Sequence, residues 1–94
     1  MADGAKGIEP GKIRLDKWLW FARVVKTRAI AQELAGSGHV RVNGQRAESA
    51  AKAIRIGDVL TIALPSRVRV LKVLDIAERR GQAQVAQALY AEIS

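Results

Sequence analysis

The side chains best suited to do chemistry are basic, and they crowd into one third of the chain. Between residues 12 and 46 there are eight Lys or Arg and two acids, so this segment carries +6 of the net +7 of all 94 residues. Clustered cations of this kind neutralise phosphate groups. The pattern predicts a surface that binds a polyanion. We favour nucleic acid over a merely solvated face because the charge is local.

Residues that could carry catalysis or hold a metal are few. The chain has no cysteine and one histidine, His39, which excludes disulfides, cysteine nucleophiles and Cys-based zinc sites. Its internal serines have no neighbouring base placed to activate them. Asp16, flanked by Arg14 and Lys17, is interpreted as a local partner that orients basic side chains. We therefore expect a protein that is not an enzyme, with no metal, cofactor or small-molecule substrate.

The overall composition predicts one small folded domain. A hydrophobic content of 49% is too high for a disordered basic tail, and 94 residues leave room for one modest core. Residues 1–12 lack the apolar stretch of a signal peptide, and the longest apolar run near the start, Trp18–Ala22, is too short to span a bilayer. We expect a cytoplasmic protein that has no membrane partner.

Two short helices are expected to position the basic residues. From Ile13 onward, apolar residues at helical spacing form one stripe for the core, made of Leu15, Trp18, Leu19 and Ala22. Arg14 and Lys17 lie on an adjoining strip, so the first helix combines a core face with a cationic one. Trp20 lies off the stripe, and two interpretations stay open: stacking on an unpaired base, or support of the C-terminal segment.

The second helix is bounded by recognisable end signals. Thr27 is suited to the N-cap, where its hydroxyl would accept a hydrogen bond from the first turn. Arg28 and Gln32 would share one face of this helix. Gly36 and Gly38 are expected to end it, because glycine adopts the left-handed conformation common at helix C-termini.

Beyond the second helix the period changes from 3.6 to 2. Val40 and Val42 alternate with outward polar residues, as in a half-buried strand. Asn43-Gly44 is typical of a two-residue hairpin turn, in which both residues have positive φ. Residues 45–52 are interpreted as a connection.

The rest of the chain predicts more strands and a closing helix. Strands are expected at residues 59–64 and 68–76, and a helix over residues 82–93, where Val85, Leu89 and Ile93 recur at four-residue spacing. The order of two helices, a small sheet and a third helix indicates an α+β fold. We divide the chain into a flexible leader (1–12), a nucleic-acid-binding core (13–64), and a strand with a closing helix of the same domain (65–94).

Four short blocks carry a family resemblance. They are RLDKWLW at residues 14–20, KTRA at 26–29, GHVRVNG at 38–44 and IGD at 56–58. In this order and spacing they resemble the small RNA-binding domain named after ribosomal protein S-four, over residues 13–64. The tryptophan-rich first helix, together with Arg79-Arg80 and Ala88-Leu89-Tyr90, is most similar to the bacterial heat-shock protein fifteen family. The ribosome-quality-control protein P family is a close second.

The resemblance implies a fold and a set of RNA contacts. Two helices would pack on a small, strongly bent sheet and, with an adjoining strand, grip structured RNA. The contacts implied by matching positions are Arg14, Lys17, Thr27, Arg28, Arg41 and Asn43. Lys26, Gln32 and Arg46 are added because they lie on the same predicted faces. Asn43 also belongs to the hairpin turn, which leaves a purely structural role open.

The resemblance also implies a function. Members of the heat-shock protein fifteen family bind large ribosomal subunits that are blocked by a nascent chain still attached to tRNA. We therefore expect a non-catalytic protein that binds structured rRNA or tRNA on the large subunit, in rescue or recycling of stalled subunits. Non-specific DNA binding is a further partner class compatible with the charge. Two alternatives stay open: a protein-interaction adaptor using the C-terminal helix, and an RNA-binding accessory of an RNA-modifying enzyme.

Overall fold

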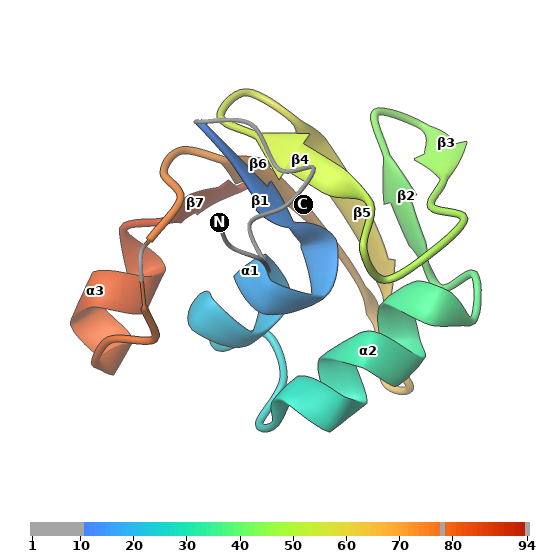
Figure 1. Ribbon diagram of the computed structural model, residues 1–94, viewed down its shortest axis with the longest axis horizontal. Coiled ribbons are helices and arrows are strands. Elements are labelled where there is room, and N and C mark those ends of the chain that lie inside the picture. Colours follow the sequence, from blue (N-terminus) through green and yellow to red (C-terminus); the bar gives the residue numbers. More distant parts are fainter. Residues whose placement is uncertain (1–10, 78, 94) are drawn as a thin grey trace, which may run out of the picture.

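The described part of the chain folds into ten short helices and strands. The computed structural model describes residues 11–77 and 79–93 (Figure 1). The elements in chain order are β1 (Lys12–Arg14), α1 (Leu15–Phe21), α2 (Arg28–Gly36), β2 (Val40–Val42), β3 (Gln45–Arg46), β4 (Ala53–Arg55), β5 (Val59–Ala63), β6 (Val68–Val73), α3 (Ala83–Gln87) and β7 (Tyr90–Glu92).

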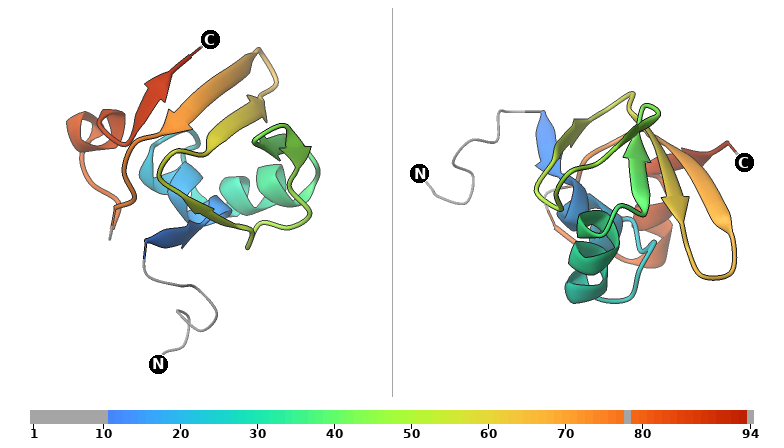
Figure 2. Two further views of the ribbon diagram at one scale, coloured as in Figure 1. Left: turned by 90° about the horizontal axis from the view of Figure 1, so that it is seen from above. Right: turned by 90° about the vertical axis from the view of Figure 1, so that its right-hand side faces the viewer.

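The strands form two antiparallel sheets. Five of them pair in the order β3-β2-β5-β6-β7, and β1 pairs with β4 in a separate two-stranded ribbon. The three helices lie on one side of the larger sheet, with α1 in the middle, α2 beside the β2–β3 end and α3 beside the β7 end (Figures 1 and 2). The α+β class and the two helices packed on a bent antiparallel sheet are confirmed.

The core forms where α1 meets the larger sheet. Leu15, Trp18 and Leu19 are fully buried and Ala22 nearly so, which confirms the predicted apolar stripe. The sheet contributes buried side chains from three central strands: Val40, Val42, Leu60, Ile62, Leu71 and Val73. Trp18 Nε1 donates to the Asp75 carbonyl at 2.9 Å, so the indole is buried without an unpaired donor.

The first helix begins two residues later than the sequence predicted. Ile13 belongs to β1, where it pairs with Ile54, and both side chains are buried. Helix α1 then starts at Leu15, whose amide donates to the Lys52 carbonyl, while the Asp16 amide donates to the Ala50 carbonyl. These bonds satisfy two of the amides that a helix start leaves unpaired. The acceptors come from a distant segment, so local periodicity gave no sign of them.

The predicted signals at the second helix and the first hairpin are confirmed. The Ile30 amide donates to Thr27 Oγ1 at 3.1 Å, so Thr27 caps α2. Gly38, just beyond the helix, has φ +87°. Asn43 and Gly44 have φ of 52° and 85°, as the predicted turn requires. The segment interpreted as a connection contains a short strand, β3, which pairs with β2.

The closing helix predicted over residues 82–93 is wrong over its second half. Helix α3 ends at Gln87, and the chain turns at Ala88–Leu89 into β7, which pairs with β6. The physical reason is the open edge of β6: the Leu74 and Asp75 amides donate to the Leu89 carbonyl, and the Ile93 amide donates to the Val70 carbonyl. Long-range strand pairing therefore overrides the helical spacing of Leu89 and Ile93.

Two further expectations meet the structure only in part. Of the predicted leader, residues 1–10 lie outside the described residues, and its last residue, Lys12, is in β1. Within the described part of the chain, no helix has both the length and the apolar character that a membrane span requires.

Candidate nucleic-acid interface

A buried acid lies at the start of α1 and holds arginine side chains. Asp16 is fully buried, and its two carboxylate oxygens accept hydrogen bonds from Arg14 Nε and Nη2 at 3.1 and 3.0 Å. The Lys17 amide donates to the same carboxylate at 2.7 Å. Arg28 Nη2, from the first turn of α2, lies 3.9 Å from Asp16 Oδ1. Asp16 thus joins the two helices and fixes two guanidinium groups at their junction.

Arg28 keeps unused hydrogen-bonding capacity. Its contact with Asp16 is an ion pair longer than a hydrogen bond, and its Nε is buried without an acceptor. The side chains of Arg14 and Arg28 are each 37% exposed. Both guanidinium groups are therefore anchored at one side and accessible at the other, as a phosphate contact needs.

The β1–β4 ribbon extends this cluster along the surface. Lys12 lies directly opposite Arg55, and Arg14 opposite Ala53. Because side chains alternate along a strand and paired residues share a face, Lys12, Arg14 and Arg55 lie together on one side of the ribbon. The buried pair of Ile13 and Ile54 occupies the other side. The ribbon therefore presents a row of cations outward.

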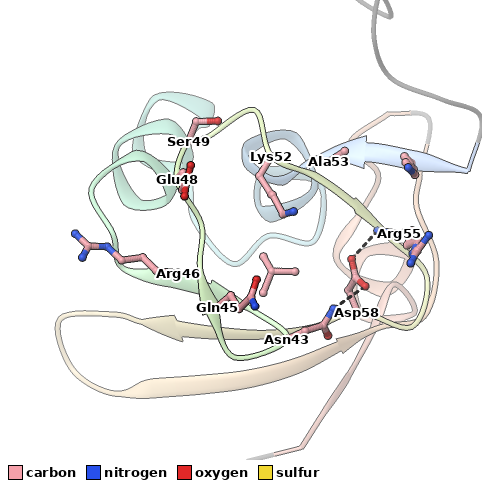
Figure 3. Close-up of a pocket in the computed structure, with 11 residues that line it drawn as sticks. Asn43, Gln45, Arg46, Glu48, Ser49, Lys52, Ala53, Arg55 and Asp58 are labelled. Atoms are coloured by element: carbon pink, nitrogen blue, oxygen red, sulfur yellow. Dashed lines mark hydrogen bonds between the residues drawn. The ribbon is translucent and has the colours of Figure 1, made fainter.

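A polar cavity adjoins the ribbon (Figure 3). It measures about 760 Å³ and lies between the β2–β3 hairpin, the segment after it and the ribbon. In Figure 3 the Lys52 side chain points into the cavity, with Arg46 on one side and Arg55 on the other. The residues that line it are Lys12, Val42, Asn43, Gln45, Arg46, Glu48, Ser49, Lys52, Ala53, Arg55 and Asp58.

The ribbon, the Asp16 cluster and the cavity share residues and form one continuous surface. We call it the basic surface and define it by its cations: Lys12, Arg14, Arg28, Arg46, Lys52 and Arg55. Lys12 belongs to both the ribbon and the cavity, and Arg14 belongs to both the ribbon and the Asp16 cluster. Cations at fixed positions along one surface are suited to follow a phosphate backbone.

Asn43 links two turns beside this surface. Its Nδ2 donates to Asp58 Oδ1 at 3.1 Å, and its Oδ1 accepts from the Val59 amide at 2.9 Å. Asp58 Oδ2 in turn accepts from the Arg55 amide. The side chain therefore ties the hairpin turn to the turn between β4 and β5. The structure gives Asn43 a positioning role at the cavity wall, and contact with RNA stays a prediction for this residue.

The other predicted contacts differ in how near they lie to the basic surface. Arg41 is exposed on β2, opposite Arg46, so two like charges face each other across the hairpin. Lys17 is half-buried, and its Nζ lies 5.8 Å from the centre of the Phe21 ring. Thr27 uses its hydroxyl oxygen as the α2 cap. Lys26 and Gln32 are exposed, and no hydrogen bond or ion pair joins them to another described residue.

Sequence reasoning placed three cations of the basic surface and missed three. Arg14, Arg28 and Arg46 were predicted, whereas Lys12, Lys52 and Arg55 were not. A weak signal existed in the alternation of cations with isoleucines around Ile13 and Ile54, which is the pattern of a strand with one buried face. The pairing of these two strands could not be predicted from local pattern.

Trp20 packs against the C-terminal part of the chain. Its carbonyl accepts a hydrogen bond from Arg80 Nε at 3.0 Å, and the Arg80 guanidinium lies 5.4 Å from the centre of the indole. Of the two interpretations of Trp20, the structure therefore favours support of a neighbouring segment.

A family model and several proteins match this chain. The model described as the S4 domain matches residues 13–60. Heat shock protein 15 of Escherichia coli (strain K12) is 42% identical over 81 residues, which cover 86% of this chain and 60% of that protein. The heat shock protein 15 homolog of Aeromonas salmonicida is 41% identical over 81 residues, with 61% of that protein covered. The chain thus spans about three fifths of the length of these relatives.

A shorter relative is matched over most of its length. The RQC P-site tRNA stabilizing factor of Bacillus subtilis (strain 168) is 30% identical over 74 residues, which cover 79% of this chain and 85% of that protein.

Solved structures agree with these matches. The trimeric structure of Vibrio cholerae Heat Shock Protein 15 superposes with a TM-score of 0.81 at 38% identity, covering 88% of this chain and 83% of that one. The solution structure of a hypothetical protein, 23% identical with a TM-score of 0.71, shares the fold. Together these similarities confirm the resemblance that the four sequence blocks predicted.

Proposed function

The chain belongs to the S4 domain family, and we propose that it is a non-catalytic RNA-binding protein that acts on the large ribosomal subunit. Its ligand is structured rRNA or tRNA, and its role is the rescue or recycling of stalled subunits. The observation that carries the proposal is the basic surface, on which six cations from five segments lie on one continuous face.

The basic surface recognises RNA by charge and by shape. Lys52 and Arg55 are exposed and neutralise phosphates, while Arg14 and Arg28 donate from guanidinium groups that Asp16 holds in place. Pre-positioned donors lose little side-chain entropy when they bind. The cavity wall adds amide and hydroxyl groups at Gln45 and Ser49 that can contact sugar or base edges.

The names of the relatives support the ribosomal part of the proposal. Several relatives are called heat shock protein 15, and the Bacillus subtilis relative is named for stabilising P-site tRNA in RQC. A basic surface of this extent is consistent with a partner made of folded RNA.

Sedimentation and crosslinking in cells test the proposal together. Ribosomal particles are separated on a gradient, the protein is located by an antibody, and RNA crosslinked to it is sequenced. We expect the protein with large subunits and crosslinks to rRNA or tRNA. Recovery only with small subunits, or in fractions free of RNA, would contradict the proposal. The same experiment is repeated with the variant Arg28→Glu, which reverses one charge of the basic surface. We expect this variant to be absent from the large-subunit fractions.

The structure does not contain the long C-terminal helix on which the adaptor alternative depends. It required a closing helix over residues 82–93, but α3 ends at Gln87 and residues 90–92 are in β7. The accessory role in RNA modification is tested by incubating the protein with rRNA or tRNA, in the presence of a candidate enzyme, and assaying modified bases.

A further inference from the structure

A second group of arginines lies away from the basic surface. Arg23 follows the end of α1, and Arg79 and Arg80 precede α3; we call these three residues the arginine patch. They border a cavity of about 750 Å³, together with Ala77, Gly81, Gln82 and Val85. In Figures 1 and 2 this part of the chain lies on the far side of α1 from the β2–β3 hairpin.

Arg23 adopts a backbone conformation that normally belongs to glycine. Its φ is 58°, and it occupies the position after the helix cap in a Schellman motif: the Val24 amide donates to the Leu19 carbonyl and the Arg23 amide to the Trp20 carbonyl. A side chain at this position costs about 1 kcal/mol relative to glycine. An arginine that replaces the favoured glycine points to a use for its side chain.

Two of the three arginines are held in place, and no carboxylate of a described residue neutralises any of the three. Arg23 Nε and Nη2 both donate to the Gly81 carbonyl, at 3.1 and 2.9 Å. Arg80 Nε donates to the Trp20 carbonyl, and its guanidinium lies over the indole. Arg79 is exposed and forms no ion pair with a described residue.

This arrangement differs from that of the half-buried Arg14 and Arg69. Arg14 pairs with the Asp16 carboxylate and Arg69 with the Glu92 carboxylate, whereas the partners of Arg23 and Arg80 are neutral carbonyls and a ring. No described residue that lines the cavity is Asp or Glu. Glu78, next to Arg79 in the sequence, lies outside the described residues. The arginine patch therefore offers an anion two oriented positive charges, at Arg23 and Arg80, and a third, exposed charge at Arg79.

We propose that the arginine patch is a second phosphate-binding surface, which takes the backbone of an RNA segment other than the one on the basic surface. The proposal rests on RNA being the partner. The two surfaces lie at opposite ends of α1, a helix of seven residues and about 10 Å. A protein with both surfaces holds two RNA segments in a fixed relation through one short, fully packed helix.

Site-specific crosslinking tests where RNA lies. The chain has no cysteine, so one introduced cysteine can carry a photoreactive label. Gln82→Cys reports the arginine patch, Gln45→Cys reports the basic surface and Ser66→Cys, in the exposed turn between β5 and β6, is the control. With large ribosomal subunits as the probe, we expect RNA crosslinks from positions 82 and 45, in different RNA segments, and few from 66.

The outcomes separate the two proposals. Crosslinks from position 45 but not from 82 would overturn the second surface and leave the proposed function standing. Crosslinks from neither position would overturn both, and crosslinks from 82 to the same nucleotides as 45 would overturn the assignment of a separate RNA segment. A patch that binds an acidic protein segment would give protein rather than RNA adducts at position 82, which also contradicts the proposal.

Two variants test the charge itself. We expect Arg79→Glu to weaken binding to large subunits about tenfold, as the loss of a charge-assisted phosphate contact and the reversal of its charge imply. Arg67→Glu makes the same charge change in the exposed turn between β5 and β6 and should have little effect. Equal weakening by both would show that net charge alone is responsible. Arg23→Gly, which removes the strained conformation, should weaken binding without lowering the melting temperature. Unchanged binding by both patch variants would overturn the proposal.

Discussion

At the scale of single residues, Asp16 shows how a buried acid can serve a cationic surface. Its carboxylate is fully buried, yet it accepts hydrogen bonds from Arg14 and from the Lys17 amide and attracts Arg28. A buried charge is tolerated when it is paired and hydrogen-bonded in this way. The sequence suggested that Asp16 orients its neighbours along the helix, and the structure adds a partner from α2 that spacing could not reveal.

Replacing this acid should therefore weaken RNA binding. We expect Asp16→Asn to destabilise the protein by about 1.5–3 kcal/mol, the usual range for hydrogen bonds to charged groups. RNA affinity should fall by about three- to tenfold, which corresponds to roughly 0.7–1.4 kcal/mol, because Arg14 and Arg28 lose their anchor. The measurements are thermal unfolding and RNA titration. An increase in affinity would show instead that Asp16 acts only as a negative charge near phosphates.

Arg28 should matter for binding far more than for folding. Its side chain is 37% exposed, and among the residues that the structure describes its one partner is Asp16, in an ion pair of 3.9 Å. We expect Arg28→Ala to lower RNA affinity by about tenfold, as the loss of a charge-assisted contact implies. The melting temperature should stay near that of the native protein in calorimetry. Gln32→Ala, on the exposed surface of the same helix, is the matched control. A large drop in melting temperature would assign Arg28 a structural role.

At the scale of elements, β7 secures the C-terminal part of the chain. It adds to the edge of β6, and Arg69 on β6 donates to the Glu92 carboxylate on β7 at 2.7 and 2.9 Å. Tyr90 packs edge to face on the buried Trp18 and lies beside the Arg69 guanidinium. The final strand thus contacts both the core and the sheet.

The Arg69–Glu92 pair should give β7 a pH-dependent contribution. The hydrogen bond from Arg69 lowers the pKa of the Glu92 carboxyl below its usual 4.5. The pair therefore stabilises the folded state fully above about pH 4.5, and this contribution is lost as the pH falls through the lowered pKa. We expect the difference in melting temperature between the native protein and Glu92→Gln to be constant from pH 7 to pH 5 and to vanish in stronger acid. A difference that persists there would contradict the pairing.

Elements set by local chemistry were predictable, and those set by distant pairing were not. The Thr27 cap and the Asn43-Gly44 turn depend on a few consecutive residues, and both were predicted correctly. β1 and β7 depend on partners elsewhere in the chain, and both were missed. β3 pairs with β2 directly across the predicted turn, but its segment was interpreted as a connection. The candidate site divides in the same way. Arg14 and Arg28 lie in recognisable motifs, and Arg46 was added from its predicted face. Lys12 and Arg55 meet through the pairing of β1 with β4, and Lys52 lies directly before β4.

At the scale of the whole molecule, the fold brings cations from separate segments of the chain onto one face. The six cations of the basic surface come from β1, α2, β3, β4 and the loop before β4, and they meet on one face. If RNA is the partner, as proposed, the net charge of +7 acts on it mainly through the basic surface, with the arginine patch as the proposed second surface. Binding should be electrostatic and depend steeply on salt.

Salt titration measures how many phosphates this surface neutralises. With about five phosphate contacts, log K should fall against log salt with a slope of about −3.5 to −4.5. The double variant Lys52→Gln and Arg55→Gln should reduce the magnitude of that slope by about 1.4–1.8, since each lost contact removes roughly 0.7–0.9. The control, Arg67→Gln with Lys72→Gln, removes the same charge from exposed positions elsewhere. An affinity independent of salt would refute the electrostatic mechanism.

The β1–β4 ribbon also determines when the protein becomes competent to bind. Lys12 pairs with Arg55 in this ribbon, so α1, α2 and the β2–β3 hairpin lie inside the loop that the pairing closes. Non-local pairing of this kind comes at the expense of chain entropy and forms slowly compared with a helix or a hairpin. During synthesis the basic segment, residues 12–46, emerges before β4, the strand with which β1 pairs. Lys12 and Arg55 can therefore come together only after β4 has been synthesised.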